Sequence, residues 1–246
     1  MGKKLFVVSD VHGHYTELIK ALHLAGFDGE NGDHIFLSCG DLFDRGQENP
    51  LVYDFVKGLQ HKILIRGNHE DMLCRILKRG SLAEHEIKNK TNITVEQLLG
   101  DGAADANGCF DTTAHSQKIR EILAFVDSMI NYYETESYVF THGWLPIDIV
   151  GRRAYIREHW REASEAEWEE ARWLEWQQLY AVGAVLAGKT IVCGHRPARL
   201  AGAFDPLREP DCSEPFYGDG MIAIDAGTVQ SGRVNVLVIE DHMLSV

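Results

Sequence analysis

Five short segments of this chain carry side chains that could bind metal ions and phosphate. Each one places aspartate, asparagine, histidine or arginine near a glycine, which lets the backbone turn sharply. Oxygen and imidazole ligands without thiolate suit Mn, Fe, Zn or Mg better than a structural zinc site built from cysteines. The pattern therefore predicts a site for two divalent ions, with Mn the first choice. The segments are Asp10–Gly13, Gly40–Gly46, Arg66–Glu70, Thr141–Gly143 and Gly194–His195.

A site of this kind is suited to the hydrolysis of phosphate esters. The reaction needs a nucleophile, neutralisation of negative charge and a proton for the leaving oxygen, and two ions about 3.5–4 Å apart supply the first two. The ions need a bridging ligand, and Asp41, which follows Gly40, is the natural one. Asp10 and His12 can then ligate one ion together. The ligands that remain for the other ion are Asn68, His142 and His195.

The same segments offer a proton donor and a phosphate binder. His69 is adjacent to Asn68, so the two are not expected to face the same ion, and His69 is free to protonate the leaving oxygen. Asp44 can hydrogen-bond the far ring nitrogen of His69 and raise its basicity. The planar guanidinium of Arg45 can donate two N–H groups to phosphate oxygens at once. We expect a hydroxide that bridges the ions as nucleophile, with His69 and Asp44 as the catalytic pair.

Strands must position these side chains. Every segment ends or closely follows an apolar stretch rich in β-forming residues, and helices are predicted between the first strands. Carboxyl ends of neighbouring parallel strands converge on one sheet edge, where open α/β folds bind ligands, so we predict an α/β fold. The strands are Leu5–Val8, Ile35–Leu37, Ile63–Ile65, Tyr138–Phe140, Ile191–Cys193 and, later, Met221–Asp225 and Val234–Ile239; the helices are Tyr15–Ala25, Leu51–Val56 and Glu70–Leu77.

Two stretches interrupt this rhythm. We interpret residues 1–246 as one domain with insertions at about 80–128 and 144–186, the first of them helical over Ile119–Val126. The second carries three tryptophans in a charged segment, Arg161–Tyr180. These rings could line a substrate groove, but an amphipathic helix that packs its tryptophans on the body is the favoured interpretation. They are Trp168, Trp173 and Trp176.

Composition limits the partners and the compartment. The formal net charge is −13, so the surface should repel nucleic acid and anionic membranes. The 5 cysteines are scattered and odd in number, which is typical of reduced thiols in a cytosolic protein. The first residues lead directly into a strand without a signal-peptide pattern, and no apolar run is long enough to span a bilayer. A cytoplasmic protein without nucleic-acid or membrane partners is expected.

The segments together resemble the calcineurin-like metallophosphoesterases, and within them the phosphoprotein phosphatases, especially small bacterial and phage-type members. The resemblance covers Leu5 to about Leu77 closely, then His142, His195 and Asp225–Gly227. It implies a central β-sandwich flanked by helices. It also implies the ligand sets and the proton donor given above. The phosphate-binding residues that we expect are Arg45, Asn68 and Arg66, the last because the family often has a matching arginine.

The resemblance implies that the chain hydrolyses phosphomonoesters, with phosphoserine, phosphothreonine or phosphotyrosine protein as the expected substrate. A dinucleoside polyphosphate or another nucleotide is the alternative, which Asp44 disfavours because the symmetrical diadenosine tetraphosphate hydrolases usually lack an acid there. An inactive binding scaffold is disfavoured because such a protein should have lost a metal ligand or the proton donor, whereas this chain has all of them. The family's further phosphate-binding arginine is missing after Trp173. Candidates for it are Arg157, Arg161 and Arg172.

Overall fold

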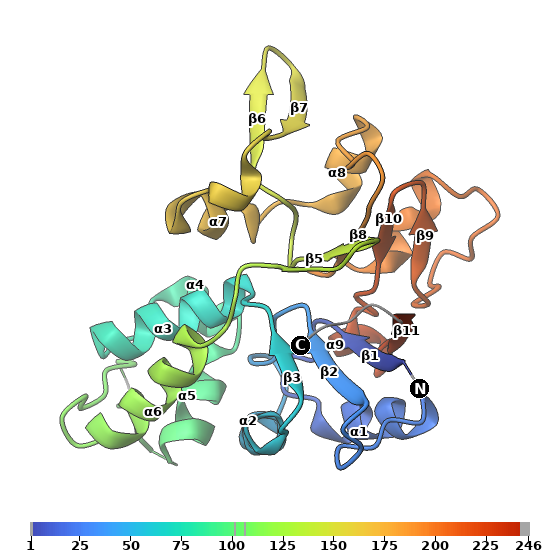
Figure 1. The fold of residues 1–246 in the computed structure, drawn as a ribbon. Helices are drawn as coiled ribbons and strands as arrows, with labels where there is room; N and C mark the ends of the chain where they lie inside the picture. The colour runs from blue at the N-terminus through green and yellow to red at the C-terminus, as the bar shows by residue number, and fades with distance from the viewer. Residues whose placement is uncertain (1, 101, 106, 242–246) are drawn as a thin grey trace.

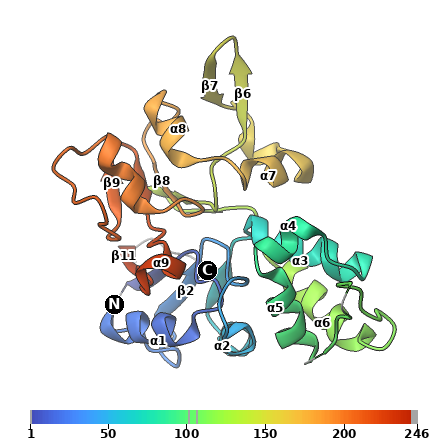
Figure 2. The same cartoon turned by 180° about the vertical axis from the view of Figure 1, so that it is seen from behind.

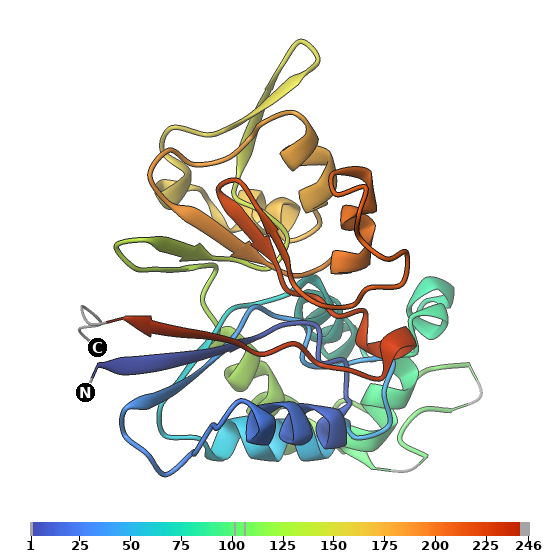
Figure 3. The same ribbon diagram turned by 90° about the vertical axis from the view of Figure 1, so that its right-hand side faces the viewer.

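The computed structural model describes residues 2–100, 102–105 and 107–241. Two mixed sheets form its centre, and they are stacked one above the other in Figure 3. The first sheet has the order β11-β1-β2-β3 and the second the order β4-β5-β8-β10-β9. This confirms the predicted α/β fold with two central sheets. The first sheet contains β1 (Lys3–Val8), β2 (His34–Ser38), β3 (Lys62–Leu64) and β11 (Leu237–Asp241); the second contains β4 (Tyr133–Glu134), β5 (Tyr138–Phe140), β8 (Thr190–Cys193), β9 (Phe216–Gly218) and β10 (Met221–Ala223).

The sheets are joined by apolar side chains that alternate along their strands. In β1, Leu5 and Val7 belong to a buried cluster that also takes in Phe140 of β5 and Val192 of β8. Phe6 and Val8 point to the opposite face, in a cluster with the helices. Successive side chains of a strand face opposite sides. A continuous apolar run is therefore what a strand needs when it is covered on both faces.

Helices alternate with the parallel strands as predicted. β1, β2 and β3 pair in parallel, and β11 pairs antiparallel with β1. The helices that follow the three parallel strands are α1 (Tyr15–Leu24), α2 (Asn49–Gly58) and α3 (Asn68–Arg79). α2 includes Pro50 in its first turn, where a missing N–H costs no hydrogen bond. α3 begins two residues earlier than predicted, which places Asn68 and His69 in its first turn.

The first insertion is more helical than predicted. It contains α4 (Glu84–Lys88) and α5 (Thr91–Leu99) before the expected helix α6 (Ser116–Asp127). α3, α5 and α6 lie together beside β3 (Figures 1 and 2). Val95 and Leu98 of α5 are buried in the same apolar cluster as the helices of the first sheet. α5 was not predicted because its first half is rich in β-branched residues, which favour strands over helices.

The second insertion differs from the single amphipathic helix that its tryptophans suggested. A hairpin of β6 (Ile147–Val150) and β7 (Arg153–Ile156) is followed by the 3-10 turn η1 (Trp160–Glu162), α7 (Glu165–Ala171) and α8 (Trp176–Ala181). Trp168 and Trp176 are buried in the core of the second sheet, as the packing interpretation predicts. Trp173 lies between the helices and is 46% exposed.

The last part of the described chain completes the second sheet and then returns to the first sheet with β11. η2 (Ala198–Ala203) follows β8, and α9 (Thr228–Ser231) lies between β10 and β11. β10 falls within the predicted Met221–Asp225 strand, whereas β11 is shifted toward the carboxyl end of the predicted Val234–Ile239 strand. Among the described residues, no helix is both long and apolar enough to cross a bilayer.

Candidate active site

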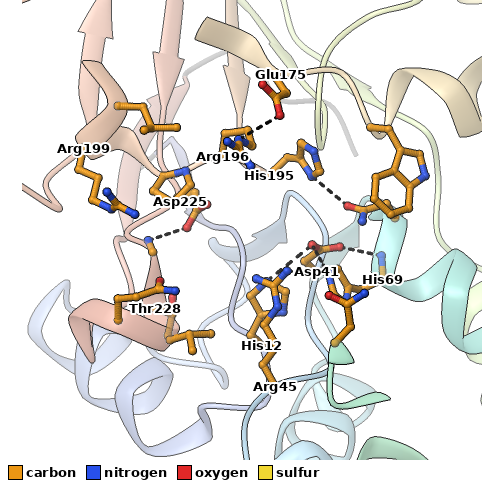
Figure 4. Close-up of a pocket in the computed structure, with 18 residues that line it drawn as sticks. His12, Asp41, Arg45, His69, Glu175, His195, Arg196, Arg199, Asp225 and Thr228 are labelled. Atoms are coloured by element: carbon orange, nitrogen blue, oxygen red, sulfur yellow. Dashed lines mark hydrogen bonds and ion pairs between the residues drawn. The ribbon is translucent and has the colours of Figure 1, made fainter. Parts of the chain in front are cut away.

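Most of the predicted site residues line or adjoin one cavity at the carboxyl ends of the strands (Figure 4). The loops after β1, β2 and β8 and the first turn of α3 supply its polar side chains. The cavity has a volume of about 380 Å³. Six predicted site residues line it: His12, Asp41, Arg45, Asn68, His69 and His195.

One group of possible metal ligands surrounds His12 and Asp41. Ligand atoms of His12, Asp41 and His69 lie within 4.8 Å of one another. His12 Nε2 is 3.7 Å from Asp41 Oδ2 and 3.9 Å from Asp10 Oδ1. The structure therefore brings together Asp10, His12 and Asp41, the predicted ligands of one ion. It also brings His69 into the same group, so His69 is a further possible ligand of this ion.

The second group forms on the other side of Asp41. Ligand atoms of Asp41, His142 and His195 lie within 4.8 Å of one another. Asn68 Oδ1 is 2.8 Å from His142 Nε2 and 3.0 Å from His195 Nδ1. His142 Nε2 also lies 3.4 Å from Asp41 Oδ1. Asp41 is common to both groups, which is the arrangement that a bridging carboxylate requires.

Two of the histidines are oriented by backbone carbonyls. His12 Nδ1 is 2.9 Å from the carbonyl oxygen of Phe43, and His142 Nδ1 is 2.7 Å from that of Cys39. A ring nitrogen that donates to a carbonyl leaves the other nitrogen with a lone pair for a cation, as ligand histidines commonly do. In both residues the remaining Nε2 faces Asp41. The donor set therefore fits two divalent ions.

The charges of the site favour a cation beside Asp41. Burial raises the pKa of Asp41, but the neighbouring histidines, His142 first, outweigh it and hold the pKa well below its ordinary value. Burial lowers the pKa of His142, yet Asp41 and its hydrogen bond raise it to about 10. Burial lowers the pKa of His195 to about 3, so its imidazole is neutral at pH 7. Positive charge is thus favoured where His142 meets Asp41.

His69 is held as a proton donor would be. Its Nδ1 lies 2.7 Å from Asp44 Oδ2, and its Nε2 faces the cavity, 3.0 Å from Nη2 of Arg45. Arg45 Nη1 also donates to His12 Nε2 at 2.9 Å. Burial lowers the pKa of His69, but Asp41 and the hydrogen bond to Asp44 outweigh burial and raise it above its ordinary value.

Asp44 is itself fixed by the first insertion, which the sequence did not reveal. Thr91 Oγ1 donates to Asp44 Oδ2 at 2.8 Å, and Thr94 Oγ1 donates to Oδ1 at 2.6 Å. Both threonines are fully buried on α5. The fold of an insertion therefore determines the orientation of the carboxylate that holds His69.

Glu70 joins two of the ligand loops, a role that sequence reasoning missed. Its carboxylate accepts hydrogen bonds from the backbone N–H groups of Asp41, Leu42 and Gly67, each at 2.9 Å. Burial raises the pKa of Glu70 to about 7, with Asp41 adding to the effect. Glu70 lies three residues after Gly67, the residue that caps the start of α3. A glutamate at this position is a helix-capping signal, and it could have been found in the sequence.

The ligand loops share an uncommon backbone conformation. Among the described residues, seven other than glycine have positive φ, and six of them are site residues. Such conformations are sparsely populated by L-residues and persist where the surrounding structure holds them. Gly40 has φ +93°, and a Cβ there would meet Gly67 at 2.8 Å, so the predicted need for glycine before Asp41 is confirmed. The six site residues are Asp10, His12, Asp41, Asp44, Arg45 and His195.

The model of the calcineurin-like phosphoesterase family matches residues 3–222. The chain belongs to the calcineurin-like phosphoesterases. Both groups of possible metal ligands, which consist of histidine and aspartate, lie within the matched residues. The match confirms the resemblance to calcineurin-like metallophosphoesterases that the sequence motifs indicated.

Its curated relatives divide into two kinds. Shewanella-like protein phosphatase 1 of Plasmodium berghei is 38% identical over 85 residues, 29% of this chain and 24% of the relative. The symmetrical bis(5'-nucleosyl)-tetraphosphatase of Coxiella burnetii is 28% identical over 144 residues, 58% of this chain and 43% of the relative. The asymmetrical enzyme of Bacillus subtilis is 31% identical over 104 residues, 39% and 43% of the two chains. The matches span less than half of each relative's length.

Solved structures share the fold at low identity. The cold-active protein-tyrosine phosphatase of a psychrophilic Shewanella species gives a TM-score of 0.56 at 19% identity, covering 98% of this chain and 76% of the other. A metallophosphoesterase from Sphaerobacter thermophilus gives 0.54 at 16%, covering 96% and 83%. These similarities support the fold alone.

The arginines of this phosphoesterase differ from the sequence-based expectation. Arg66 Nε lies 2.6 Å from Asp71, and Arg66 lines a different surface hollow, so the structure does not bring it to the phosphate position. The three candidates for a further arginine are all engaged elsewhere. The cavity is instead lined by Arg196 and Arg199, which sequence reasoning missed. The engaged candidates are Arg157 with Asp148, Arg161 with Glu134, and Arg172 with Asp71.

Two further residues also line the cavity. Asp225 Oδ1 accepts a hydrogen bond from the Gly227 N–H at 2.6 Å, so its carboxylate caps the turn after β10. The exposed ring of Trp173 lies edge-on to His195, with ring centroids 6.0 Å apart. Trp173 therefore fits the groove interpretation, whereas Trp168 and Trp176 fit the packing interpretation.

Proposed function

We propose that this phosphoesterase hydrolyses phosphomonoesters with His69 as general acid. The observation that carries the proposal is the 2.7 Å contact between His69 Nδ1 and Asp44, with Nε2 turned to the cavity. A histidine held from behind by a carboxylate can deliver a proton from Nε2 to a leaving oxygen, once Arg45 has turned from that nitrogen to the phosphate. Arg45, whose fork reaches the same nitrogen, is placed to hold the phosphate oxygens.

The two clusters would hold the metal ions. Asp10, His12 and Asp41 would bind one ion, and the other would be bound by Asp41, Asn68, His142 and His195. When bound, such ions acidify a water molecule and neutralise phosphoryl oxygens. Oxygen and imidazole donors suit Mn²⁺, Fe, Zn²⁺ or Mg²⁺, and Mn²⁺ is the ion we propose to test first.

A phosphorylated protein is the first candidate substrate. The protein phosphatase among the relatives supports it, and so does the presence of Asp44, which helps an alkoxide such as that of serine to leave. The second candidate is a nucleotide such as a dinucleoside polyphosphate. It is supported by the relatives with bis(5'-nucleosyl)-tetraphosphatase names and by the exposed ring of Trp173 in the cavity wall.

The test uses His69→Asn on esters of different leaving groups, in protein loaded with Mn²⁺. We expect kcat to fall by roughly 10²–10⁴ for phosphoserine peptides and much less for nitrophenyl phosphate, whose leaving group departs without a proton. The bound metal should stay unchanged. Equal losses across the series, or the loss of a metal ion, would show that His69 is a ligand or a phosphate binder. The absence of both metal binding and phosphatase activity in the wild type would instead support a scaffold.

A further inference from the structure

The cavity extends beyond the metal ligands to a second wall formed after β8 and β10. Arg196 and Arg199 follow the ligand His195, and Thr228 begins α9 (Figure 4). These three residues line the side of the cavity away from Arg45 and His69. None of them takes part in the proposed acid catalysis.

The donors of this wall are incompletely used within the protein. Thr228 is 1% exposed, and its buried hydroxyl has no hydrogen-bond partner. Arg196 Nε is also buried without a hydrogen bond, although Glu175 Oε1 lies 3.4 Å away. Among the described residues, Arg199 has no recorded hydrogen bond or ion pair, and its side chain is exposed at the cavity wall. Buried polar groups without partners carry a desolvation cost that a ligand can remove.

We propose that Arg196, Arg199 and Thr228 form a second phosphoryl subsite of the same cavity. A terminal phosphoryl group presents several oxygens, so it can accept from two guanidinium groups and a hydroxyl at once. Glu175 and Asp225 are the acidic residues in this part of the cavity, and Glu175 screens only Arg196. The substrate class is then a phosphoester that carries a further phosphoryl group, such as a nucleoside polyphosphate. The inference rests on the proposed hydrolysis of phosphate esters at the metal ligands.

The test compares substrates with one and with several phosphoryl groups. The variant Arg196→Gln with Arg199→Gln is assayed on nitrophenyl phosphate and on a dinucleoside tetraphosphate, with Thr228→Val as a smaller second variant. The ratio of kcat/KM for the tetraphosphate to that for the aryl phosphate should fall at least about tenfold in the double variant, the worth of charge-assisted hydrogen bonds. Arg152→Gln, an exposed arginine on the β6–β7 turn, is the matched control and should leave the ratio unchanged.

A binding measurement separates this inference from the proposed function. Calorimetry on the Mn²⁺-loaded protein should show that the double variant loses affinity for tripolyphosphate by at least about tenfold while orthophosphate affinity changes little. This result would support the subsite even if the wild type hydrolysed no aryl phosphate, which would count against the function alone. Equal weakening for both anions would overturn the subsite.

Discussion

Single residues at the site adopt conformations that their types rarely choose. Asp10, His12 and Asp41 all have positive φ, with values near 50°. Each such residue costs on the order of 1–3 kcal/mol, so the rest of the fold must hold it in place. The hydrogen bonds of Glu70 to the Asp41 and Gly67 backbone are one such restraint. Precise ligand placement is therefore obtained at the expense of local stability.

Thr91 and Thr94 are expected to act on catalysis through Asp44. Thr91→Val and Thr94→Val each remove one hydrogen bond to that carboxylate. We expect kcat on phosphoserine peptides to fall roughly threefold to tenfold in each variant, the kinetic equivalent of a hydrogen bond, and less on nitrophenyl phosphate. Thr91→Ser should restore the rate, and Thr112→Val, exposed in the same insertion, should have no effect. Losses that are independent of the leaving group would mean that the threonines act only on folding.

At the scale of elements, one buried arginine connects the second insertion to the first half of the fold. Arg172, 2% exposed at the end of α7, lies 2.6 Å from Asp71 of α3 and 2.6 Å from Glu165. It also donates to Asn131 at 2.7 Å. This explains why Arg172, a candidate phosphate binder from the sequence, is a structural residue.

Removing this arginine should therefore reduce stability. We expect Arg172→Met to lower the free energy of unfolding by about 2 kcal/mol, because the buried carboxylate of Asp71 loses one of its two arginine partners and keeps Arg66. Arg75→Met is the matched control, since Arg75 joins α3 to Glu169 of α7 on the surface and should cost less than about 1 kcal/mol. Urea unfolding of the two variants gives the comparison. Similar costs for both would show that burial does not decide the strength of this connection.

Glu134 of β4 should make stability depend on acid pH. Hydrogen bonds from Arg161 and Lys189 lower its pKa to about 2, despite partial burial. A carboxyl group whose pKa is lower in the folded protein stabilises the fold fully at pH values above its unfolded pKa of 4.5. This stabilisation is lost as the pH falls from 4.5 toward 2. Glu134→Gln should therefore cost up to ~1 kcal/mol at pH 5.5 and less at pH 3, measured by urea unfolding. A cost that does not shrink at pH 3 would contradict this, and Glu136→Gln is the exposed control.

At the scale of the whole molecule, local sequence predicted the strand ends and their ligands, because each ligand follows its strand within a few residues. It did not predict groups that tertiary packing brings in. Thr91 and Thr94 lie about 50 positions after Asp44, on a helix whose β-branched residues favour a strand in the sequence. The role of Arg196 depends on how η2 and α9 fold over the cavity. The β6–β7 hairpin was missed because exposed Ile149 and Val150 give it no buried face.

The account depends on Asp41 as a ligand shared by two metal ions. The most direct measurement is the metal content and metal titration of stripped, Mn²⁺-reloaded protein, for the wild type and for Asp41→Asn. We predict about two ions per chain in the wild type, weakened binding at both sites in Asp41→Asn, and weakening mainly at one site when His12 is replaced. Fewer than two ions in the saturated wild type, or two sites of unchanged affinity in Asp41→Asn, would contradict the account.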